Sequence, residues 1–590
     1  MNVVRTARLP DQSDKIKQAE LQFATAMTCH CAIRAVDHIV ELVKRESKGS
    51  NSDLANMRLH RTKCTGLIKN VISPALKLDV IDDVKDKKFA IIVDESTDLK
   101  CQKHMCIMLR FFSSKENRVV TRFLSLVSVL AATGEALYNS IEQEISECGL
   151  QMANCIGYAS DGAANMVGTN NSVWTRIKQA SPSCIQLKCI CHSLALCIEH
   201  AVAKLPSSIG YLLTKIPSWF SKSKNRRDDF IALFDTINTS MTDDVRVAPL
   251  PFDKIATTRW LSRGKVMFSI LMNWFELEAY FTAAEKGETL PDRRYKARII
   301  KEMLQDSCTY LYIVFATPIV QEFEKVNATF QQTSADPHAL HQELLLFFNS
   351  LRSRIIDPNG HKKPLHKVDF GAKFVSECDL LEKKQPDPTT KAKISNVKVR
   401  CAAMIEESIS QLNDRVPPVS NVFKGLANLN PEVVLSTDKR VAFTDLPMQY
   451  LMNDINAIEE QYRRLVLIDW TDHEPFAKCL PTNTEEFWCG VMKREGFFDL
   501  AKYALTCLVT PVSNAVVERV FSLVTAVKTK PRNALELKTL DAIVRIRSTL
   551  MLDGKCCVDF IPTRRMMELF KADVVYGTDP SGSDDLANFI

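Results

Sequence analysis

The stretch FAIIVDESTD, residues 89–98, runs from an uninterrupted apolar segment into a carboxylate. Its first five residues are apolar and rich in β-branched side chains, as is typical of a strand buried at the centre of a sheet. The stretch MANCIGYASDGAANMVG, residues 152–168, repeats this arrangement, because a short apolar run meets an aspartate followed by small and polar residues. Each stretch therefore predicts a buried strand that ends at an aspartate, Asp94 in the first and Asp161 in the second.

The segments between and after these two strands predict the rest of a sheet. Residues 104–112 and 118–130 are apolar and are joined by SSKEN, a polar loop of hairpin length. A helix is expected next, with Thr133 as its N-cap and Gly149 at its C-terminal end. Strand and helix then alternate, with strands over 152–159 and 184–191 and helices over 172–179 and 193–205. The order β-β-β-α-β-α-β-α predicts an α/β fold with a mixed sheet.

The composition is typical of a folded chain with several domains. At 590 residues the chain exceeds what one hydrophobic core usually organises. Hydrophobic residues make up 46% and charged residues 25%, which excludes an intrinsically disordered chain. Lys and Arg number 76 against 70 Asp and Glu, for a formal net charge of +6. This mild basic excess is compatible with nucleic-acid binding without requiring it.

The sequence predicts neither export nor a membrane span. The first twenty residues lack the apolar core of a signal peptide, and we find no uncharged apolar run of about 18 residues. The 19 cysteines are scattered along the chain, unlike those of a secreted disulfide scaffold. We therefore expect an intracellular protein, not secreted, with mostly reduced thiols and no membrane partner.

Five regions are expected along the chain. After the sheet, long amphipathic patterns such as KVMFSILMNWFELEAYFTAAE predict a large helical domain. Polar segments bearing Pro and Lys predict loops at 357–396 and 413–421 within it. The predicted regions are a helical N-terminal region (1–84), the first part of an α/β core (85–204), an all-helical insertion (205–500), the end of the core with an association region (501–553) and a tail (554–590).

The two strand-end aspartates are candidates for a metal site. If the first and fourth strands are neighbours, Asp94 and Asp161 meet at one edge of the sheet, where two carboxylates repel unless a cation joins them. Oxygen ligands suit Mg²⁺ or Mn²⁺, and two such ions can act on a phosphodiester. Glu518, in SNAVVERVFS, is the candidate third ligand. The alternative is structural, because aspartates are common in turns and a glutamate stabilises the first turn of a helix.

Motifs spread over most of the chain resemble those of the hAT superfamily of DNA transposases and the host proteins derived from them. FAIIVDESTD, GYASDGAANMVG, CICH, TRW and SNAVVERVFS followed by KPRNALELKTLDAIVRIRS occur in the family's order, between about residues 20 and 550. The resemblance implies an RNase H-like core, formed by 85–204 and 501–553 and interrupted by the all-α insertion. It also implies an Asp-Asp-Glu catalytic triad at Asp94, Asp161 and Glu518, with Mg²⁺ or Mn²⁺ as cofactor.

The resemblance further implies contacts with DNA, and we expect the protein in the nucleus or the cytoplasm. The C-x-x-H pair Cys189 and His192 matches a motif near the active site or the DNA, whereas Cys197 and His200 form a second pair that fits core packing. Basic clusters lie at 222–227 and 293–298, and many such clusters are only solvated surface. The residues expected to bind DNA are Cys189, His192, Arg259, Trp260 (stacking on an unpaired base, or else buried at a helix start), Lys528, Lys530 and Arg532.

Two departures from the family pattern favour a rival function. Ser96 stands where many relatives have a tryptophan. The cysteines and histidines before Asp94 do not have the spacing of a zinc finger; these are Cys29, His30, Cys31, His38, His60 and Cys64. The first function is thus a transposase-like DNA nuclease and strand transferase. The rival is a domesticated, catalytically silent nuclear protein that binds DNA or protein, and an unrelated RNase H-like nuclease is a third possibility.

The C-terminal region is expected to form a homodimer or higher homo-oligomer. The resemblance implies dimerisation there, and the segment has more apolar positions than one core-facing stripe requires. These positions are Val516, Val517, Val520, Phe521 and Val524, followed by Leu537, Leu540, Ile543 and Ile546.

Overall fold

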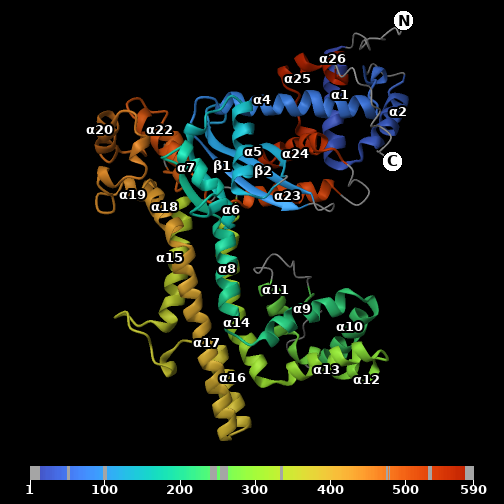
Figure 1. The fold of residues 1–590 in the computed structure, drawn as a ribbon, viewed down its shortest axis with the longest axis vertical. Coiled ribbons are helices and arrows are strands. Elements are labelled where there is room, and N and C mark those ends of the chain that lie inside the picture. The colour runs from blue at the N-terminus through green and yellow to red at the C-terminus, as the bar shows by residue number, and fades with distance from the viewer. Residues whose placement is uncertain are drawn as a thin grey trace. The chain divides into compact units, whose positions relative to one another are not determined.

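The structure is a computed structural model that describes residues 13–48, 53–97, 102–129, 131–239, 249–252, 263–332, 336–472, 476, 479–528 and 535–577. The chain divides into two compact units, which we describe separately (Figure 1). Unit 1 comprises residues 1–189 and 428–590, and unit 2 comprises residues 190–427. No helix within the described residues has both the length and the apolar character that a membrane span requires.

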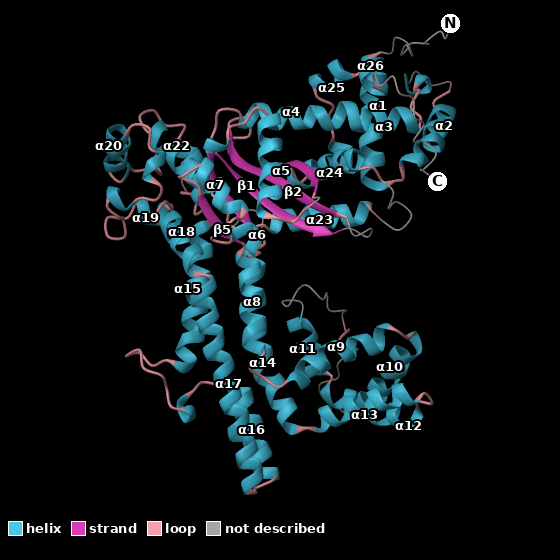
Figure 2. Ribbon diagram, in the orientation of Figure 1, coloured by secondary structure: helices cyan, strands magenta, loops and turns pink. Residues whose placement is uncertain are grey.

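Unit 1 contains a five-stranded mixed sheet (Figure 2). Its strands are β1 (Phe89–Thr97), β2 (Lys103–Ser113), β3 (Arg118–Ser128), β4 (Cys155–Ser160) and β5 (Ile185–Lys188), in the spatial order β3-β2-β1-β4-β5. Strands β1, β2 and β3 pair antiparallel, whereas β4 runs parallel to β1 and β5 runs parallel to β4. The predicted mixed sheet is confirmed, but the strand expected over 184–191 ends at Lys188 because a helix begins at Ile190.

One face of the sheet packs against the helices that follow β3 and β4. These are α5 (Gly134–Glu147), the short α6 (Ala164–Val167) and α7 (Val173–Ala180). Ile91 and Val93 of β1 join the same buried cluster as Leu137 and Ile141 of α5 and Ile177 of α7. Thr133 caps α5, accepting a hydrogen bond from the Ala136 N–H at 3.2 Å, as its position in the sequence predicts. The alternation of β1 residues therefore sends Ala90, Ile92 and Asp94 to the opposite face.

Helices from the C-terminal third of the chain also pack against the sheet. The helix α22 (Phe498–Cys507) contacts β2, α23 (Ala515–Val527) contacts β1 and β2, and α24 (Leu537–Leu552) contacts β3. A Cβ placed on Gly157 of β4 would lie 2.8 Å from Pro511 Cδ and 3.1 Å from Ala90 Cβ. Glycine at this position thus allows the segment before α23 to approach the centre of the sheet.

The N-terminal helices enclose α24 from the side away from the sheet. They are α1 (Asp14–His30), η1 (Ile33–Ala35), α2 (Val36–Glu46), η2 (Asp53–Asn56), α3 (Arg61–Gly66), the π-helical η3 (Leu67–Ile72) and α4 (Ser73–Val84). α24 contacts α1, η3 and α4. Arg545 of α24 is buried, and its Nε donates to Ser73 Oγ at 3.1 Å while Nη1 donates to the Phe123 carbonyl at 3.3 Å. One arginine thus links α24 to both α4 and β3.

Unit 1 is completed by short elements on either side of α22–α24. Before them come α19 (Pro431–Val434), η7 (Phe443–Asp445), η8 (Gln449–Leu451), α20 (Ile455–Leu465) and α21 (Thr484–Val491); after them come η10 (Cys557–Asp559), α25 (Arg564–Leu569) and α26 (Ala572–Tyr576). Glu485 accepts a hydrogen bond from the Val119 N–H of β3 at 2.8 Å. Residues 428–500, which the sequence analysis assigned to the insertion, therefore pack with the sheet-containing unit.

Within the described residues unit 2 is mainly helical; its segments outside α-helices include 249–252 and 356–371, the latter with an isolated bridge between Ile356 and Lys362. The predicted loop is therefore confirmed over 357–371. It contains α8 (Ile190–Val202), α9 (Ser207–Ser221), α10 (Lys224–Thr239), α11 (Arg263–Met272), α12 (Trp274–Gly287), α13 (Pro291–Gln305), α14 (Ser307–Phe330), α15 (Pro337–Ile355), η6 (Leu365–Lys367), α16 (Ala372–Lys384), α17 (Pro388–Arg415) and α18 (Pro417–Ala427). The loop predictions at 357–396 and 413–421 were wrong over α16, α17 and α18. Proline there occupies helix starts, as Pro388 does in α17 beside the N-cap Asp387.

Candidate active site

Asp94 and Asp161 lie at the same level on two adjacent parallel strands. In the register of β1 and β4 the last paired residues are Ile92 and Ala159, and each aspartate lies two residues beyond its member of that pair. Both carboxylates are half-buried. The Glu95 N–H donates to Asp94 Oδ1 at 2.9 Å, and the Ala163 N–H donates to Asp161 Oδ1 at 3.2 Å. The contact of Asp161 is a turn contact of the kind that the structural alternative predicts, whereas the contact of Asp94 lies within strand β1.

Glu518 reaches this site from the C-terminal part of unit 1. It lies in the first turn of α23, the helix that packs against β1 and β2, and its side chain is half-buried. The negative charge of Glu518 acts on Asp94 and raises the pKa of that carboxyl. Two residues separated by more than 400 positions in the sequence thus share one electrostatic environment.

The pKa of the Asp94 carboxyl is strongly raised in this site. Burial, the charge of Asp161 and the charges of Glu518 and Glu95 together raise its pKa to about 7, while the Glu95 N–H acts in the opposite direction. A carboxyl surrounded by other carboxylates is stabilised by any cation that enters the site, because the cation removes both the repulsion and the uncompensated charge. The three residues therefore fit the chemistry of a divalent cation.

Glu95 is a fourth carboxylate that the sequence analysis did not assign. Its side chain lies on the other face of β1, where Oε1 accepts from Asn165 Nδ2 at 3.5 Å. Burial and the charge of Asp161 raise the pKa of Glu95, whereas Lys103 lowers it. The sequence signal for Glu95 is its position directly after Asp94. Adjacent residues of a strand face opposite sides of the sheet, so this position does not predict a set of ligands in which Glu95 and Asp94 share one face.

The three carboxylates are close enough to interact, but they do not form a compact single-ion cluster. Within the described residues, the ligand oxygens of Asp94, Asp161 and Glu518 do not all lie within 4.8 Å of one another. A site with two ions about 3.5–4 Å apart needs a wider set of ligands than a site with one ion. Mg²⁺ also keeps several of its waters, which extend the reach of each carboxylate.

The other predicted site residues have different surroundings. Cys189 is buried directly after β5, and its N–H donates to the Ser160 carbonyl at 2.9 Å, next to Asp161. Lys528 is also buried, with Nζ 3.4 Å from His104 Nε2, so it is not presented on the surface of unit 1. His192 is exposed in the first turn of α8, in unit 2. Arg259, Trp260, Lys530 and Arg532 lie outside the described residues.

The second C-x-x-H pair does not form a joint site. Cys197 is buried in unit 2, whereas His200 is exposed and its Nε2 lies 3.1 Å from Arg415 of α17. Burial raises the pKa of the Cys197 thiol to about 12, which keeps it protonated. This pair therefore fits the packing interpretation.

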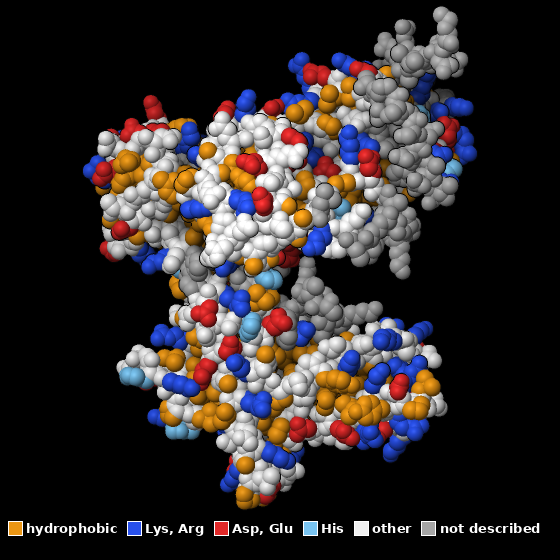
Figure 3. All heavy atoms as spheres, viewed as in Figure 1, with side chains coloured by type: hydrophobic (Ala, Val, Ile, Leu, Met, Phe, Trp, Pro, Cys, Tyr) orange, Lys and Arg blue, Asp and Glu red, His pale blue; other side chains and the backbone are white. Residues whose placement is uncertain are grey.

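Basic side chains gather on the surface of unit 2 (Figure 3). On α13 the exposed members are Arg293, Arg294, Lys296 and Arg298. In the other predicted cluster Arg226 is an exception, because it pairs with Glu288 at 2.6 Å and covers the Trp219 ring at 3.8 Å. The exposed members of α13 are better placed for a polyanion than the buried Lys528.

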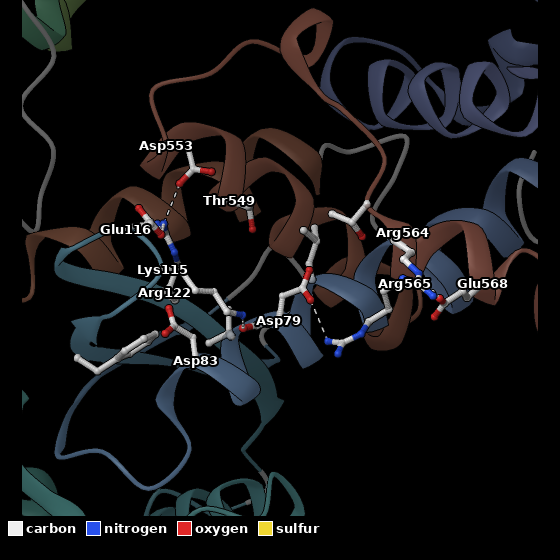
Figure 4. A pocket seen from close by; sticks show the side chains of 14 residues that line it. Asp79, Asp83, Lys115, Glu116, Arg122, Thr549, Asp553, Arg564, Arg565 and Glu568 are labelled. Carbon is white, nitrogen blue, oxygen red and sulfur yellow. Dashed lines mark hydrogen bonds and ion pairs between the residues drawn. The ribbon is translucent and has the colours of Figure 1, made fainter. Parts of the chain in front are cut away.

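A cavity of about 610 Å³ lies elsewhere in unit 1 (Figure 4). It is lined by residues of α4, the β2–β3 hairpin, the end of α24 and α25. Its charged groups pair with one another: Arg565 contacts Asp79 at 2.8 Å and Asp82 at 2.6 Å, and Arg122 contacts Asp553 at 2.9 Å. These contacts satisfy the arginines internally, and none of the predicted site residues lines the cavity.

Residues 38–172 match the model of the DUF4371 family, described as "ZMYM1/FAM200, RNase-like domain". This family is transposase-derived. The matched range contains strands β1 to β4 with Asp94 and Asp161, and it ends before Cys189 and Glu518. The match therefore supports an RNase-like, transposase-derived character for the part of the sheet that carries both aspartates.

The apolar positions of the predicted association region are largely used within the chain. Val517, Val520 and Val524 of α23 and Leu540, Ile543 and Ile546 of α24 are buried. α24 carries more apolar positions than one stripe because it packs against β3 and also against α1, η3 and α4. The excess apolar surface thus has an explanation within one chain, and association remains a prediction.

Proposed function

We propose that this chain is a hAT transposase-like protein that cleaves and joins DNA strands, with an RNase H-like core and an Asp94-Asp161-Glu518 triad. The level placement of Asp94 and Asp161 on adjacent parallel strands carries the proposal. Glu518 is the third member of the triad in this proposal, because its negative charge raises the pKa of Asp94. The RNase-like, transposase-derived match over residues 38–172 supports the same core.

In this proposal the three carboxylates hold Mg²⁺ or Mn²⁺. Bound divalent ions activate a water or a 3′-hydroxyl and stabilise charge on the phosphodiester in in-line displacement. The protein itself determines where the negative charges lie. The pairing of β1 with β4 positions the two aspartates, and the packing of α23 on β1 and β2 positions Glu518. Because Asp94 lies within β1, Glu518 lies within α23 and Asp161 directly follows β4, the geometry of the site does not depend on a loop alone.

The proposed substrate is DNA, bound in the nucleus by a homodimer or higher homo-oligomer. The net charge of +6 and the exposed basic residues of α13 favour a polyanionic partner. Because counterions are released when phosphates are bound, the affinity should fall steeply as salt is raised.

The test is a plasmid-nicking assay on the full chain with Mg²⁺ or Mn²⁺, combined with calorimetric measurement of divalent-ion binding. Asp161→Asn keeps the shape and the oxygen that accepts the Ala163 N–H, but it removes the charge. We expect a loss of cleavage of 10²-fold or more and weaker ion binding, with an unchanged fold. Asp438→Asn, at an exposed carboxylate in unit 1, is the matched control. Equal cleavage by wild type and Asp161→Asn would overturn the proposal.

The second candidate is a domesticated, catalytically silent protein that uses the same scaffold to bind DNA or protein. The matched family is itself transposase-derived, and Ser96 stands where many hAT relatives have a tryptophan. In this case the wild type would bind DNA in a salt-dependent manner without cleaving it in either metal, and Asp161→Asn would leave the binding unchanged.

A further inference from the structure

Three potential metal ligands from the two ends of unit 1 meet at one point. They are His30, the last residue of α1, and Cys556 and Cys557, at the start of η10. One ligand atom from each residue lies within 4.8 Å of the other two. His30 and Cys556 are exposed and Cys557 is buried.

A fourth ligand lies beside this group. Cys29 precedes His30 in α1, and its half-buried thiol makes a side-chain contact with Cys557 and a charge interaction with Cys556. The surrounding packing holds the two segments together, because α1 contacts η10 and Gln22 Nε2 donates to the Phe560 carbonyl at 3.2 Å. Cys29 is not among the three residues whose ligand atoms lie within 4.8 Å of one another, so its thiol would complete a set of four, Cys29, His30, Cys556 and Cys557, by a side-chain rotation.

We propose that these four residues bind one Zn²⁺ ion and join the N-terminal helix α1 to the C-terminal segment of unit 1. Three thiolates and one imidazole form a common structural zinc set. With Zn–S bonds of about 2.3 Å, tetrahedral ligands lie roughly 3.7 Å apart. The separations of up to 4.8 Å among the ligand atoms of His30, Cys556 and Cys557 allow this geometry after small side-chain rotations, and Cys29 would join them as the fourth ligand.

The charge of the site also fits. Zn²⁺ with three thiolates and a neutral imidazole carries a net charge of about −1. Arg547 of α24 lies close to Cys29, and its Nε donates to the Thr28 carbonyl at 2.6 Å. The positive charge of Arg547 opposes this net negative charge, and water reaches the exposed ligands His30 and Cys556, so the bound ion is accessible to a chelator.

The function of the ion would be to fix the position of the terminal segments around α24. The site is closed by ligands more than 500 positions apart in the sequence, so it constrains the unfolded chain as a long-range crosslink does. This position is separate from the carboxylate triad, so the zinc site and the proposed cleavage activity can be tested independently.

The experiment measures zinc content and the cobalt spectrum of the full chain. After purification with reductant and dialysis, we expect one Zn²⁺ per chain by elemental analysis. Substitution with Co²⁺ should give the visible bands of a tetrahedral ion and a thiolate charge-transfer band in the near ultraviolet. Cys556→Ser should weaken zinc binding more than tenfold, whereas Cys479→Ser, also at an exposed cysteine of unit 1, should leave it unchanged.

Two results would overturn the proposal. One is equal zinc content in wild type and Cys556→Ser, which would place the metal on other thiols. The other is a chain that takes up no zinc when fully reduced, or whose intact mass shows a disulfide among Cys29, Cys556 and Cys557 under the conditions used for zinc loading. Because Cys556 is exposed, we expect its substitution to leave the fold intact, and circular dichroism of both variants checks this directly.

Discussion

Asp94 and Asp161 lie at the same level on two adjacent parallel strands, two residues beyond the Ile92–Ala159 pair. Asp161 directly follows β4, as the sequence predicts, whereas β1 continues to Thr97, so the prediction that this strand ends at Asp94 was wrong. Parallel strands bring their carboxyl ends to one edge of a sheet, so two short apolar runs in the sequence suffice to bring two negative charges together. The result is a pKa of about 7 for Asp94, caused first by burial and then by the charge of Asp161. The same relationship that favours a cation also makes the metal-free protein less stable.

The first prediction concerns the loss of stability that the ionised Asp94 carboxylate causes in the metal-free protein. In chelator, the folded Asp94 carboxyl holds its proton up to a pH of about 7, whereas the unfolded chain releases it near the ordinary value of 3.8. The folded state therefore binds more protons between these values, and its stability falls as the pH rises through this window. Asp94→Asn lacks this cost, so its free energy of unfolding should exceed that of wild type by about 1–2 kcal/mol at pH 8, allowing for partial exposure.

The measurement is the melting temperature of both proteins at pH 5 and pH 8 in chelator. The advantage of Asp94→Asn should be larger at pH 8, and added Mg²⁺ should stabilise wild type but not the variant. A difference in melting temperature that is independent of pH would contradict the assignment of the cost to ionisation of Asp94.

A second prediction concerns a buried ion pair in the N-terminal region. Lys63 Nζ and Glu20 Oε2 lie 2.5 Å apart, and both side chains are almost completely buried at 1% and 0% exposure. Burial lowers the pKa of Lys63, and Glu20 opposes this effect. Lys63→Met would leave the Glu20 carboxylate buried without its partner, which should cost about 3–5 kcal/mol.

Chemical denaturation provides the comparison. Lys44→Met, which removes an exposed partner of Glu41 at 2.7 Å, should change stability by no more than about 0.5 kcal/mol. The double variant Glu20→Gln/Lys63→Met should recover part of the loss, because it buries no net charge. Similar losses of stability for Lys63→Met and Lys44→Met would show that the Lys63–Glu20 pair contributes no more to stability than the Lys44–Glu41 pair.

The sheet and the two aspartates could be predicted because their signals are local. A continuous apolar run predicts a buried strand, and the hairpin between β2 and β3 has a polar loop of the expected length. The end of β5 could not be predicted in the same way. The residues after Lys188 are still apolar, and a short apolar segment has the same composition in a buried helix as in a buried strand.

Other features depended on contacts between distant parts of the chain. The proline of α17 resembled a loop signal, although it occupies the start of a helix of 28 residues. Cys29 and His30 had no zinc-finger spacing because the cysteines that meet them are at 556 and 557. Similarly, the apolar excess of α24 reflects packing on two sides within the chain, which the pattern alone does not distinguish from a dimer surface.

A third prediction tests the close packing at the centre of the sheet. Gly157→Ala would place a Cβ 2.8 Å from Pro511 Cδ, so the segment before α23 must move. We expect a loss of stability of about 1–3 kcal/mol, as is usual for overpacking. Gly210→Ala is the control, because no atom lies within 4 Å of its Cβ position and alanine favours a helix. If Gly157→Ala proved as stable as wild type in thermal melts, this close approach would not constrain the fold.

The last prediction separates the two roles open to Glu518. A glutamate in the first turn of α23 stabilises the helix whether or not it binds an ion, and this effect is worth about 0.3–1 kcal/mol. Glu486 occupies the first turn of α21 and is exposed, so Glu486→Gln removes a helix-terminal charge away from the triad. Glu518→Gln and Glu486→Gln should therefore differ little in helix stabilisation.

Only Glu518→Gln should weaken divalent-ion binding, and it should lower the pKa of Asp94 because one of the repelling charges is gone. If Glu518 acts with the aspartates as one unit, Asp161→Asn/Glu518→Gln should lose little more cleavage than either single variant. Losses that multiply in the double variant would show that Glu518 acts independently of Asp161, and equal ion binding by the two glutamine variants would assign Glu518 to the helix alone.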